Sequence, residues 1–198
     1  MKKIILSAIA VLAFGLTNAQ GVKFGVKAGL NVTTITGGEL SASSKVGFHV
    51  GGLVEFKLTD KFAVQPELLF STKGAKADFG GFTFEQNLSY IDLPIMVKYF
   101  VMEGLSIEAG PQVSFLMSAK GKADGVSVDN KKEFSSTDFG FNIGAGYELT
   151  SGLFFQARYN LGFSDISKAP PVDPDFPEFS INYKEKNNGF QVSVGYKF

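Results

Sequence analysis

The sequence predicts an all-β chain that folds as an eight-stranded antiparallel up-and-down transmembrane β-barrel. Three observations lead to this prediction. From residue 22 onward, apolar and polar residues alternate along segment after segment. The alternating segments number eight, which is even. The connections between them are short and long in turn, a layout that is typical of barrels in bacterial outer membranes.

Alternation of this kind puts apolar side chains on one face of a strand and polar side chains on the other. The expected strands are residues 22–32, 46–58, 62–73, 90–100, 105–118, 138–149, 153–164 and 190–198. Many of them fit the roughly 9–11 residues that a tilted strand needs to cross a bilayer. Short turns are expected at 59–61, 102–104 and 150–152, and long links at about 33–45, 74–84, 119–136 and 165–188.

Residues 1–19 form a separate segment with the features of a secretory signal peptide. Two lysines near the start precede an apolar run from Ile4 to Leu16, and small or polar residues follow up to Ala19. Such a run is short of the roughly 20 residues that a spanning helix needs, although a retained anchor helix is the alternative. We expect export, cleavage after Ala19, and one barrel domain over residues 20–198.

The composition excludes several classes of function. The 198 residues include 23 Gly and 21 Phe but no Cys, and the formal net charge is zero. Without cysteine there is no disulfide framework, thiolate metal site or thiol nucleophile. Without a basic field the chain has no electrostatic footprint for nucleic acid. No cofactor is expected.

The character of the two faces favours a membrane over a soluble barrel or sandwich, which would also alternate. The polar face consists mainly of Gly, Ser, Asn, Gln and charges of both signs, which suit a narrow hydrogen-bonded lumen. The apolar face is continuous, with Phe and Tyr near the strand ends, as in an aromatic girdle. A closed barrel also satisfies every backbone polar group, as lipid requires. The chain ends at Phe198 on this outward face, and a terminal aromatic resembles the assembly signal of outer-membrane barrels.

A family resemblance is carried by four successive stretches and one earlier stretch. The four are "YIDLPIMVKYF", "IEAGPQVSFLMSAK", "DFGFNIGAGYEL" and "ARYNLGFSDI", and the earlier one is "FGVKAGLNVT". In this order they resemble the PorT-like outer-membrane β-barrel family of Bacteroidetes, over nearly all of residues 20–198. The resemblance implies an eight-stranded barrel in the outer membrane. The family's namesake is linked to protein secretion and gliding, but membership alone does not transfer that role.

Three prolines fall on successive expected strands. Pro66, Pro94 and Pro111 lie at similar heights. Proline removes a ladder hydrogen bond, and a closed barrel has no edge strand on which to place it. We therefore expect a bulged or bent patch at these positions.

The inward face carries the charges from which a site could be built. Arg158 is the one arginine of the sequence, and a buried guanidinium needs carboxylate partners. Glu67 and Glu108 lie at about its height above the short turns. The expected network of lumen charges comprises Arg158, Glu67, Glu108, Glu148, Asp92 and Lys98. It is either a structural set of ion pairs that fills the lumen, as is usual for eight strands, or a gate on a narrow ion or proton path.

His49 is the one histidine, and it also points inward. Nothing in the spacing selects a serine and an acid to form a hydrolytic triad with it. One histidine without cysteine makes no zinc pattern. We expect a structural histidine, no catalytic residue and no metal site.

The longest link, at 165–188, is the candidate for recognition, because loops carry most binding functions. It places Phe176, Phe179 and Tyr183 among acids. The alternatives are a solvated surface loop, a recognition loop for a protein or glycan, and a calcium site using Asp165, Asp173, Asp175 and Glu178, whose spacing matches no known calcium loop.

The sequence therefore favours a non-enzymatic barrel of the bacterial outer membrane, with a filled lumen and long outer loops for binding or envelope support. Its partners would be outer-membrane lipid, the assembly machinery and an extracellular protein or glycan. Three other hypotheses stay open: a small channel past Arg158, a barrel enzyme acting on lipid or peptide at the loop rim, and an accessory component of a secretion system.

Overall fold

The computed structural model describes residues 21–37, 43–79, 82–123, 126–168 and 184–198. The strands are β1 (Val22–Thr36), β2 (Ser43–Lys57), β3 (Phe62–Phe79), β4 (Phe82–Phe100), β5 (Leu105–Ala123), β6 (Val126–Asp129), β7 (Thr137–Glu148), β8 (Leu153–Gly162) and β9 (Lys186–Lys197). A 3₁₀ turn, η2 (Lys131–Glu133), lies between β6 and β7. No helix in these ranges is long and apolar enough to cross a membrane. The expected signal peptide, residues 1–19, lies outside the described residues.

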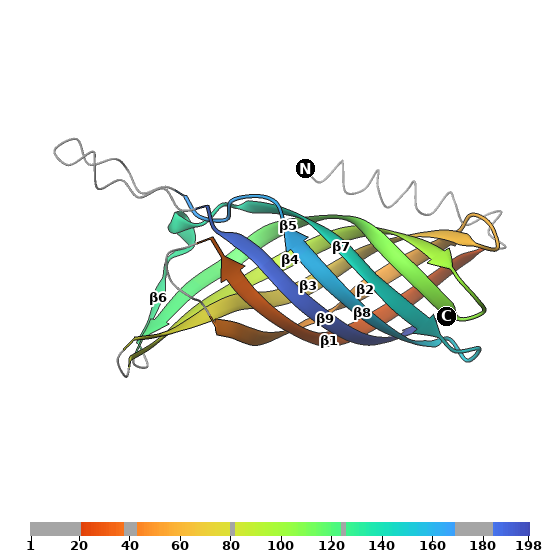
Figure 1. Ribbon diagram of the computed structural model, residues 1–198, viewed down its shortest axis with the longest axis horizontal. Helices are drawn as coiled ribbons and strands as arrows, with labels where there is room; N and C mark the ends of the chain where they lie inside the picture. The colour runs from red at the N-terminus through yellow and green to blue at the C-terminus, as the bar shows by residue number, and fades with distance from the viewer. Residues whose placement is uncertain (1–20, 38–42, 80–81, 124–125, 169–183) are drawn as a thin grey trace.

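Eight of the strands close into a barrel whose strands tilt against its long axis (Figure 1). Every pairing is antiparallel, the first strand β1 pairs with the last strand β9, and β4 pairs with β5 to complete the ring. The predicted fold class, an eight-stranded antiparallel up-and-down transmembrane β-barrel, is confirmed. Because the ring has no edge strand, its backbone groups are satisfied by their neighbours.

The strands are staggered as a closed tilted sheet requires. A row of paired residues starts at Val22 and passes through Phe56, Val64, Val97, Ala109, Ile143, Tyr159 and Phe190. It returns to β1 at Val32, ten residues beyond its start. For eight strands such a barrel has an interior just wide enough for side chains to fill.

The two faces divide by polarity as predicted. In β1, Lys27 and Asn31 are almost completely buried, whereas the outward Val26 and Leu30 are more than half exposed. The pattern repeats round the barrel, so the buried set is mostly polar and the exposed set is mostly apolar. This inversion of the usual globular arrangement is what a lipid solvent demands.

The three short turns occur where they were expected and gather at one end of the barrel with the C-terminus, here called the short-turn end (Figure 1). Gly104 (φ 78°) and Gly152 (φ 89°) close two of them. Both values lie in the left-handed region, which glycine adopts without steric cost. The opposite end, from which the other connections extend, is the long-loop end.

The expected long links are shorter than predicted. Strands β3 and β4 run on to Phe79 and from Phe82, so most of the link at 74–84 is strand. The link at 119–136 contains the end of β5 and a ninth strand, β6, which pairs with β5 alone. Beyond the apolar outward surface these extensions carry polar residues such as Lys76 and Glu85 on their outward face, although Ala75, Gln86 and Ala119 stay buried on the inward face. Their outward face therefore needs no apolar residues, which is why the sequence pattern missed them.

The bulge expected at the three prolines is not present. The register between neighbouring strands is the same on both sides of Pro66, Pro94 and Pro111, so the bulge is ruled out, whereas the bent patch, which was the other alternative, stays a prediction. Instead, each proline interrupts the ladder on the side of the preceding strand and pairs normally with the following one. A missing N–H affects one neighbour only. The register shifts lie nearer the long-loop end, between Ser44 and His49 and between Ser89 and Tyr90.

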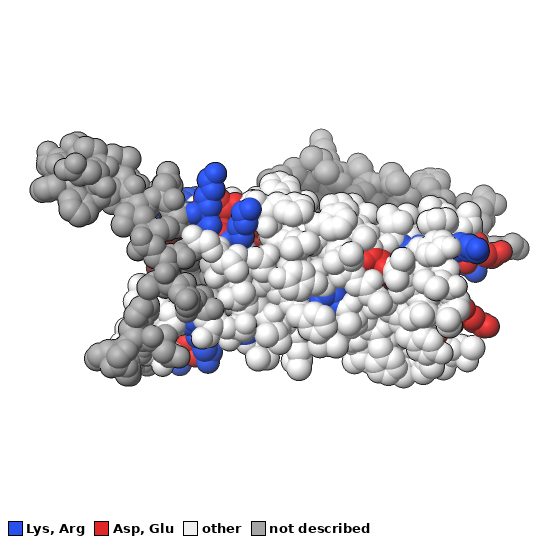
Figure 2. Space-filling model, in the orientation of Figure 1, with Lys and Arg blue, Asp and Glu red and all other residues white. Residues whose placement is uncertain are grey.

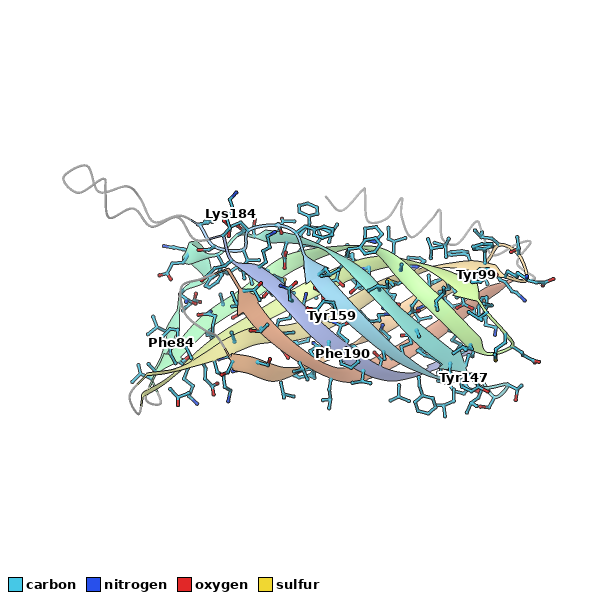
Figure 3. The ribbon with its side chains drawn as sticks, in the orientation of Figure 1. Phe84, Tyr99, Tyr147, Tyr159, Lys184 and Phe190 are labelled. Atoms are coloured by element: carbon cyan, nitrogen blue, oxygen red, sulfur yellow. The ribbon has the colours of Figure 1, made fainter. Side chains whose placement is uncertain are left out.

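Aromatic side chains mark both borders of the apolar band. Near the short turns, exposed rings include Phe24, Phe62, Tyr147, Phe155, Tyr196 and Phe198. The outer girdle, toward the long loops, consists of Phe48, Phe70, Phe115, Phe139, Phe163 and Phe190. Tyr99 and Tyr147 lie at the short-turn end and Phe84 lies far beyond the outer girdle (Figure 3). Charged side chains gather toward the two ends, and the band between them is largely uncharged (Figure 2).

Candidate functional site

Arg158 lies at the centre of the lumen and joins three strands. Its position on β8 faces Gly144 of β7, where an added Cβ would lie 2.8 Å from the arginine Cγ, so the glycine leaves room for the side chain. The two terminal nitrogens of the guanidinium donate to both oxygens of Glu67 at 2.9 and 2.7 Å. Its Nε donates to Glu108. Such two-pronged pairing is the strongest geometry available to this group.

A second cation completes the cluster. The Lys27 ammonium lies 2.7 Å from Glu67 and donates to Gln156 at 3.3 Å, while Gln65 donates to Glu67 at 2.6 Å. The side chains of Lys27 and Glu67 have no exposed surface. The two cations and two carboxylates therefore have no net charge, and each buried charge has a partner of opposite sign, as burial requires. We call Lys27, Glu67, Glu108 and Arg158 the central charge cluster.

A second chain of ion pairs lies nearer the short turns. Glu55 accepts from Lys98 at 2.7 Å and from Lys197 at 2.6 Å. Lys197 also reaches Glu148 at 2.7 Å, and Glu148 pairs with Lys23, whose side chain is about half exposed. Below this chain an open vestibule of about 1140 Å³ is bordered by the short turns, with Glu55, Glu148 and Lys197 among its lining residues. The lumen thus opens toward the short-turn end and stops at these ion pairs.

His49 lies above the central charge cluster, between an amide and a hydroxyl. Its Nδ1 is 2.7 Å from the Asn31 Oδ1, and its Nε2 is 2.8 Å from the Ser193 hydroxyl. Since the amide oxygen only accepts, Nδ1 carries the proton and Nε2 accepts from the serine. This resembles the order of a catalytic triad, but His49 is 1% and Ser193 7% exposed. A substrate carbonyl about 3 Å from the serine oxygen would have no room, which favours the structural role.

A third polar layer lies nearer the long loops. Lys73 pairs with Asp92 at 3.2 Å and stands 4.9 Å above the centre of the Tyr90 ring. Asn187 donates to the Tyr90 hydroxyl and to Asp138. The Asp92 Oδ2 and the Asn187 Oδ1 make no hydrogen bond within the described residues.

Apolar side chains seal the lumen above this layer. The seal consists of Leu88, Tyr90, Leu116, Ala119, Phe134 and Ile166, packed against Ile35. Leu88 and Tyr90 point inward from β4, whereas Phe134 and Ile166 come from the segments that precede β7 and follow β8. The seal separates the polar lumen from the long-loop end.

Backbone hydrogen bonds hold the two outer segments over the seal. Residues 130–136 and 164–168, called the cap, are joined by Ser135 N to the Ile166 carbonyl at 2.8 Å and by Lys168 N to the Glu133 carbonyl at 2.8 Å. Asp165 accepts from the amide of Glu185 at 3.0 Å, which ties the cap to the start of β9. Burial, and then the nearby Asp165, raise the pKa of the Glu185 carboxyl above its ordinary value.

The structure brings some of the expected site residues together and separates others. Arg158, Glu67 and Glu108 form one cluster, whereas Lys98 and Glu148 belong to the lower chain and Asp92 to the upper layer. Phe198 directly follows β9; the residue is 75% exposed, and its ring centre lies 5.2 Å from that of Tyr196. Phe176, Phe179 and Tyr183 lie outside the described residues, as do Asp173, Asp175 and Glu178.

The sequence did not reveal the apolar seal or the partners that join the layers. Leu88 and Tyr90 are in phase with Asp92, which is a signal that they face the lumen, but alternation alone does not show that apolar side chains gather there. No group of three or more histidine, aspartate or glutamate side chains within the described ranges could hold a metal ion. Asp165, the one described member of the suggested calcium set, instead accepts from two backbone amides.

Comparison with known proteins agrees with this architecture. The model of the outer membrane protein beta-barrel domain family matches residues 18–168. The chain belongs to this family. As a member of the outer membrane protein beta-barrel domain family, it resides in the bacterial outer membrane. In such barrels the short turns face the periplasm and the long loops face the exterior. No curated protein matches the sequence.

Two bacterial proteins of known structure share this fold. Neisserial surface protein A aligns over 90% of this chain and 100% of its own, with a TM-score of 0.61 and 14% identity. The attachment invasion locus protein Ail of Yersinia pestis aligns over 90% of this chain and 99% of its own, with a TM-score of 0.51 and 14% identity. Its structure with the heparin analogue sucrose octasulfate gives a TM-score of 0.52 at 12% identity, covering 90% and 100%. At these identities the likeness concerns the fold.

Proposed function

We propose that this protein is a non-enzymatic, non-conducting barrel that displays its outer loops for binding at the cell surface. The observation that supports the proposal best is the central charge cluster. Arg158 on β8 reaches Glu67 on β3 and Glu108 on β5, so one side chain spans the lumen. A permeant ion would have to replace paired, buried charges, and removing one partner of such a pair is costly.

The outer end of the lumen supports the same proposal. A solute that passed the central charge cluster would next meet the apolar seal and then the hydrogen-bonded cap. Hydrophobic constrictions exclude ions because they remove water. The two barriers lie at different depths and differ in chemistry, so opening one of them leaves the other in place.

A role in surface binding rests on the loops and on the structural likeness. Ail is an attachment invasion locus protein, and it has been captured with a heparin analogue. A barrel with the same fold and a closed lumen has its outer loops as the surface available to a partner. We infer a protein or glycan ligand for the long connection between β8 and β9.

The refolded barrel in planar bilayers tests the proposal through its single-channel conductance. We expect no conductance from the wild type, and none from Arg158→Ala, in which the seal and cap persist. As a matched control, Lys61→Ala removes an exposed charge at the short-turn end. Steady conductance of the wild type that changes with Arg158→Ala but not with Lys61→Ala would show a pore and refute the proposal.

The quoted sequence stretches support a finer placement in the PorT-like branch of Bacteroidetes barrels, which we propose on that resemblance. An accessory role in a secretion system is the second function that this placement suggests. Co-purification of the intact barrel from its native membrane with other envelope proteins would support it, whereas a lone barrel would support the surface-display function.

A further inference from the structure

The outward surface above the outer girdle carries an uneven set of charges. Lysines gather where β2, β3, β4 and β5 leave the apolar band and β6 joins them. We call Lys45, Lys76, Lys120, Lys122 and Lys131 the outer lysine patch. The acids beside it whose side chains the structure describes are Glu85 and Asp129, so among these side chains there is an excess of three positive charges.

Strand pairing places Lys76, Lys120 and Lys122 on one face with Glu85. Glu85 of β4 lies opposite Lys76 of β3 on one side and Lys122 of β5 on the other. Lys120 is two residues from Lys122 and therefore shares its face. Gly121 between them would direct a side chain toward Phe84 and Gln86 on the inner face, so the two lysines point outward.

The two kinds of lysine in the patch differ in their partners. Lys45 and Lys76 both pair with Glu85, at 2.6 and 2.8 Å. Lys120 and Lys122 are exposed, and no described carboxylate lies within ion-pairing distance of either ammonium. Their charges are therefore available to an external anion.

Lys131 fixes the height of the patch at the border of the lipid band. The register shift between β4 and β5 leaves Met117 without a partner on β4. The carbonyl of Met117 accepts from the Lys131 ammonium at 2.9 Å. Met117 itself is 54% exposed, two residues beyond Phe115 of the outer girdle. A lysine charge is thus held where the apolar surface ends.

We propose that the outer lysine patch binds the anionic phosphate groups of outer-leaflet lipid. Three observations select this occupant: the excess positive charge, its continuity with the lipid-facing surface through Met117 and Phe115, and its place at the exterior end of an outer-membrane barrel. Clusters of lysines beside a membrane attract anionic headgroups with about 1 kcal/mol per lysine. The phosphate groups would lie between Lys120, Lys122 and Lys131, and the acyl chains would lie along the outer girdle.

The inference is independent of whether the lumen conducts, so the conductance experiment and the lipid experiment can fail separately. The probe is bis-phosphorylated lipid A in mixed detergent micelles, with binding to the folded barrel counted by native mass spectrometry. Lys120→Gln with Lys122→Gln removes the two unpaired charges of β5. The matched control is Lys57→Gln with Lys61→Gln, which makes the same change of charge at the short-turn end.

We expect the β5 double variant to bind the lipid roughly 30-fold more weakly than the wild type, from about 1 kcal/mol for each lysine, and the control to bind it unchanged. Lipid A stripped of its phosphates should bind the wild type at least as weakly as the intact lipid binds the double variant, because the double variant keeps Lys131. Equal binding by the two double variants, or equal binding of the two lipids, would overturn the proposal. Displacement of the lipid by inorganic pyrophosphate at equal concentration would assign the patch to a soluble anion and overturn the lipid as its source.

Discussion

At the scale of single residues, the central charge cluster depends on Glu67. This carboxylate receives hydrogen bonds from Arg158, from Gln65 and through an ion pair from Lys27. Glu67→Gln would leave two buried cations with one carboxylate, Glu108, between them. Breaking a buried pair in this way costs about 3–5 kcal/mol. We therefore expect Glu67→Gln to unfold at a lower urea concentration than the wild type. Circular dichroism is the suitable probe of unfolding, because the chain lacks tryptophan.

Two variants separate the charge effect from loss of packing. Glu103→Gln alters an exposed carboxylate in a short turn and should leave the urea midpoint of unfolding unchanged. Lys27→Gln together with Glu67→Gln removes one charge of each sign, so it should cost less than Glu67→Gln alone. A double variant as unstable as the sum of the two single variants would show that charge balance does not govern the cluster.

Glycine at position 29 creates the space for His49. A Cβ on Gly29 would lie 2.0 Å from the Val192 carbonyl oxygen and 2.7 Å from the His49 ring. Gly29→Ala should therefore destabilise the barrel by about 2 kcal/mol or more, since overpacking forces the backbone to move. Gly52→Ala is the control, because its nearest atom, the Gly25 carbonyl oxygen, is 3.7 Å from the added Cβ. Equal unfolding midpoints for the two variants would contradict this account.

At the scale of elements, the cap should respond to pH through Glu185. Burial, with Asp165 nearby, raises the pKa of this carboxyl in the folded state. Its neutral form is favoured there, so its stabilising contribution is complete below the ordinary carboxyl pKa of about 4.3 and is lost as the pH rises through the raised folded value. We expect the Ile166 amide, bonded to the Glu185 carbonyl at 2.9 Å, to be protected from hydrogen exchange several-fold better near pH 4 than near pH 7.

Glu185→Gln keeps the side-chain shape and removes the titration. Protection factors of Ile166 in this variant should be the same at both pH values, after correction for intrinsic exchange. Glu103→Gln, far from the cap at the short-turn end, should keep the wild-type dependence. A pH dependence that survives Glu185→Gln would assign it to another group.

Alternation predicted the barrel strands because every residue in the lipid band faces either lipid or lumen. In β4 it placed Ile95 and Val97 outward and Lys98 inward, as the structure has them. The same rule failed beyond the band, where β6 is exposed throughout and the outward face of β3 and β4 carries Lys76 and Glu85 in place of apolar residues. It also cannot show which inward groups meet. Arg158 is 91 residues from Glu67, and only the stagger of the closed ring brings them to one height.

At the scale of the whole molecule, the two ends of the barrel are built differently. The lumen is closed toward the exterior by the apolar seal and the cap, and it opens toward the short turns as a vestibule above which Glu55 and Lys197 are paired. Outside, an uncharged band separates the short-turn charges from the outer lysine patch. We therefore propose that contact with lipid and with partners falls to the outer surface and loops.

We propose that Phe198 contributes more to the assembly of the barrel in the membrane than to the stability of the folded barrel. Phe198 is 75% exposed, its ring makes an edge contact with Tyr196, and it lies where an assembly signal is expected. Phe198→Ala removes little buried surface, so heat-induced unfolding of protein refolded in detergent should be unchanged, as judged by gel mobility. In cells the amount of heat-modifiable barrel in the outer membrane should fall several-fold.

Phe163→Ala is the control, since this residue is 61% exposed at the opposite border of the lipid band. An equal loss of membrane-inserted protein in both variants would mean that any girdle aromatic serves insertion and that the C-terminal position carries no signal.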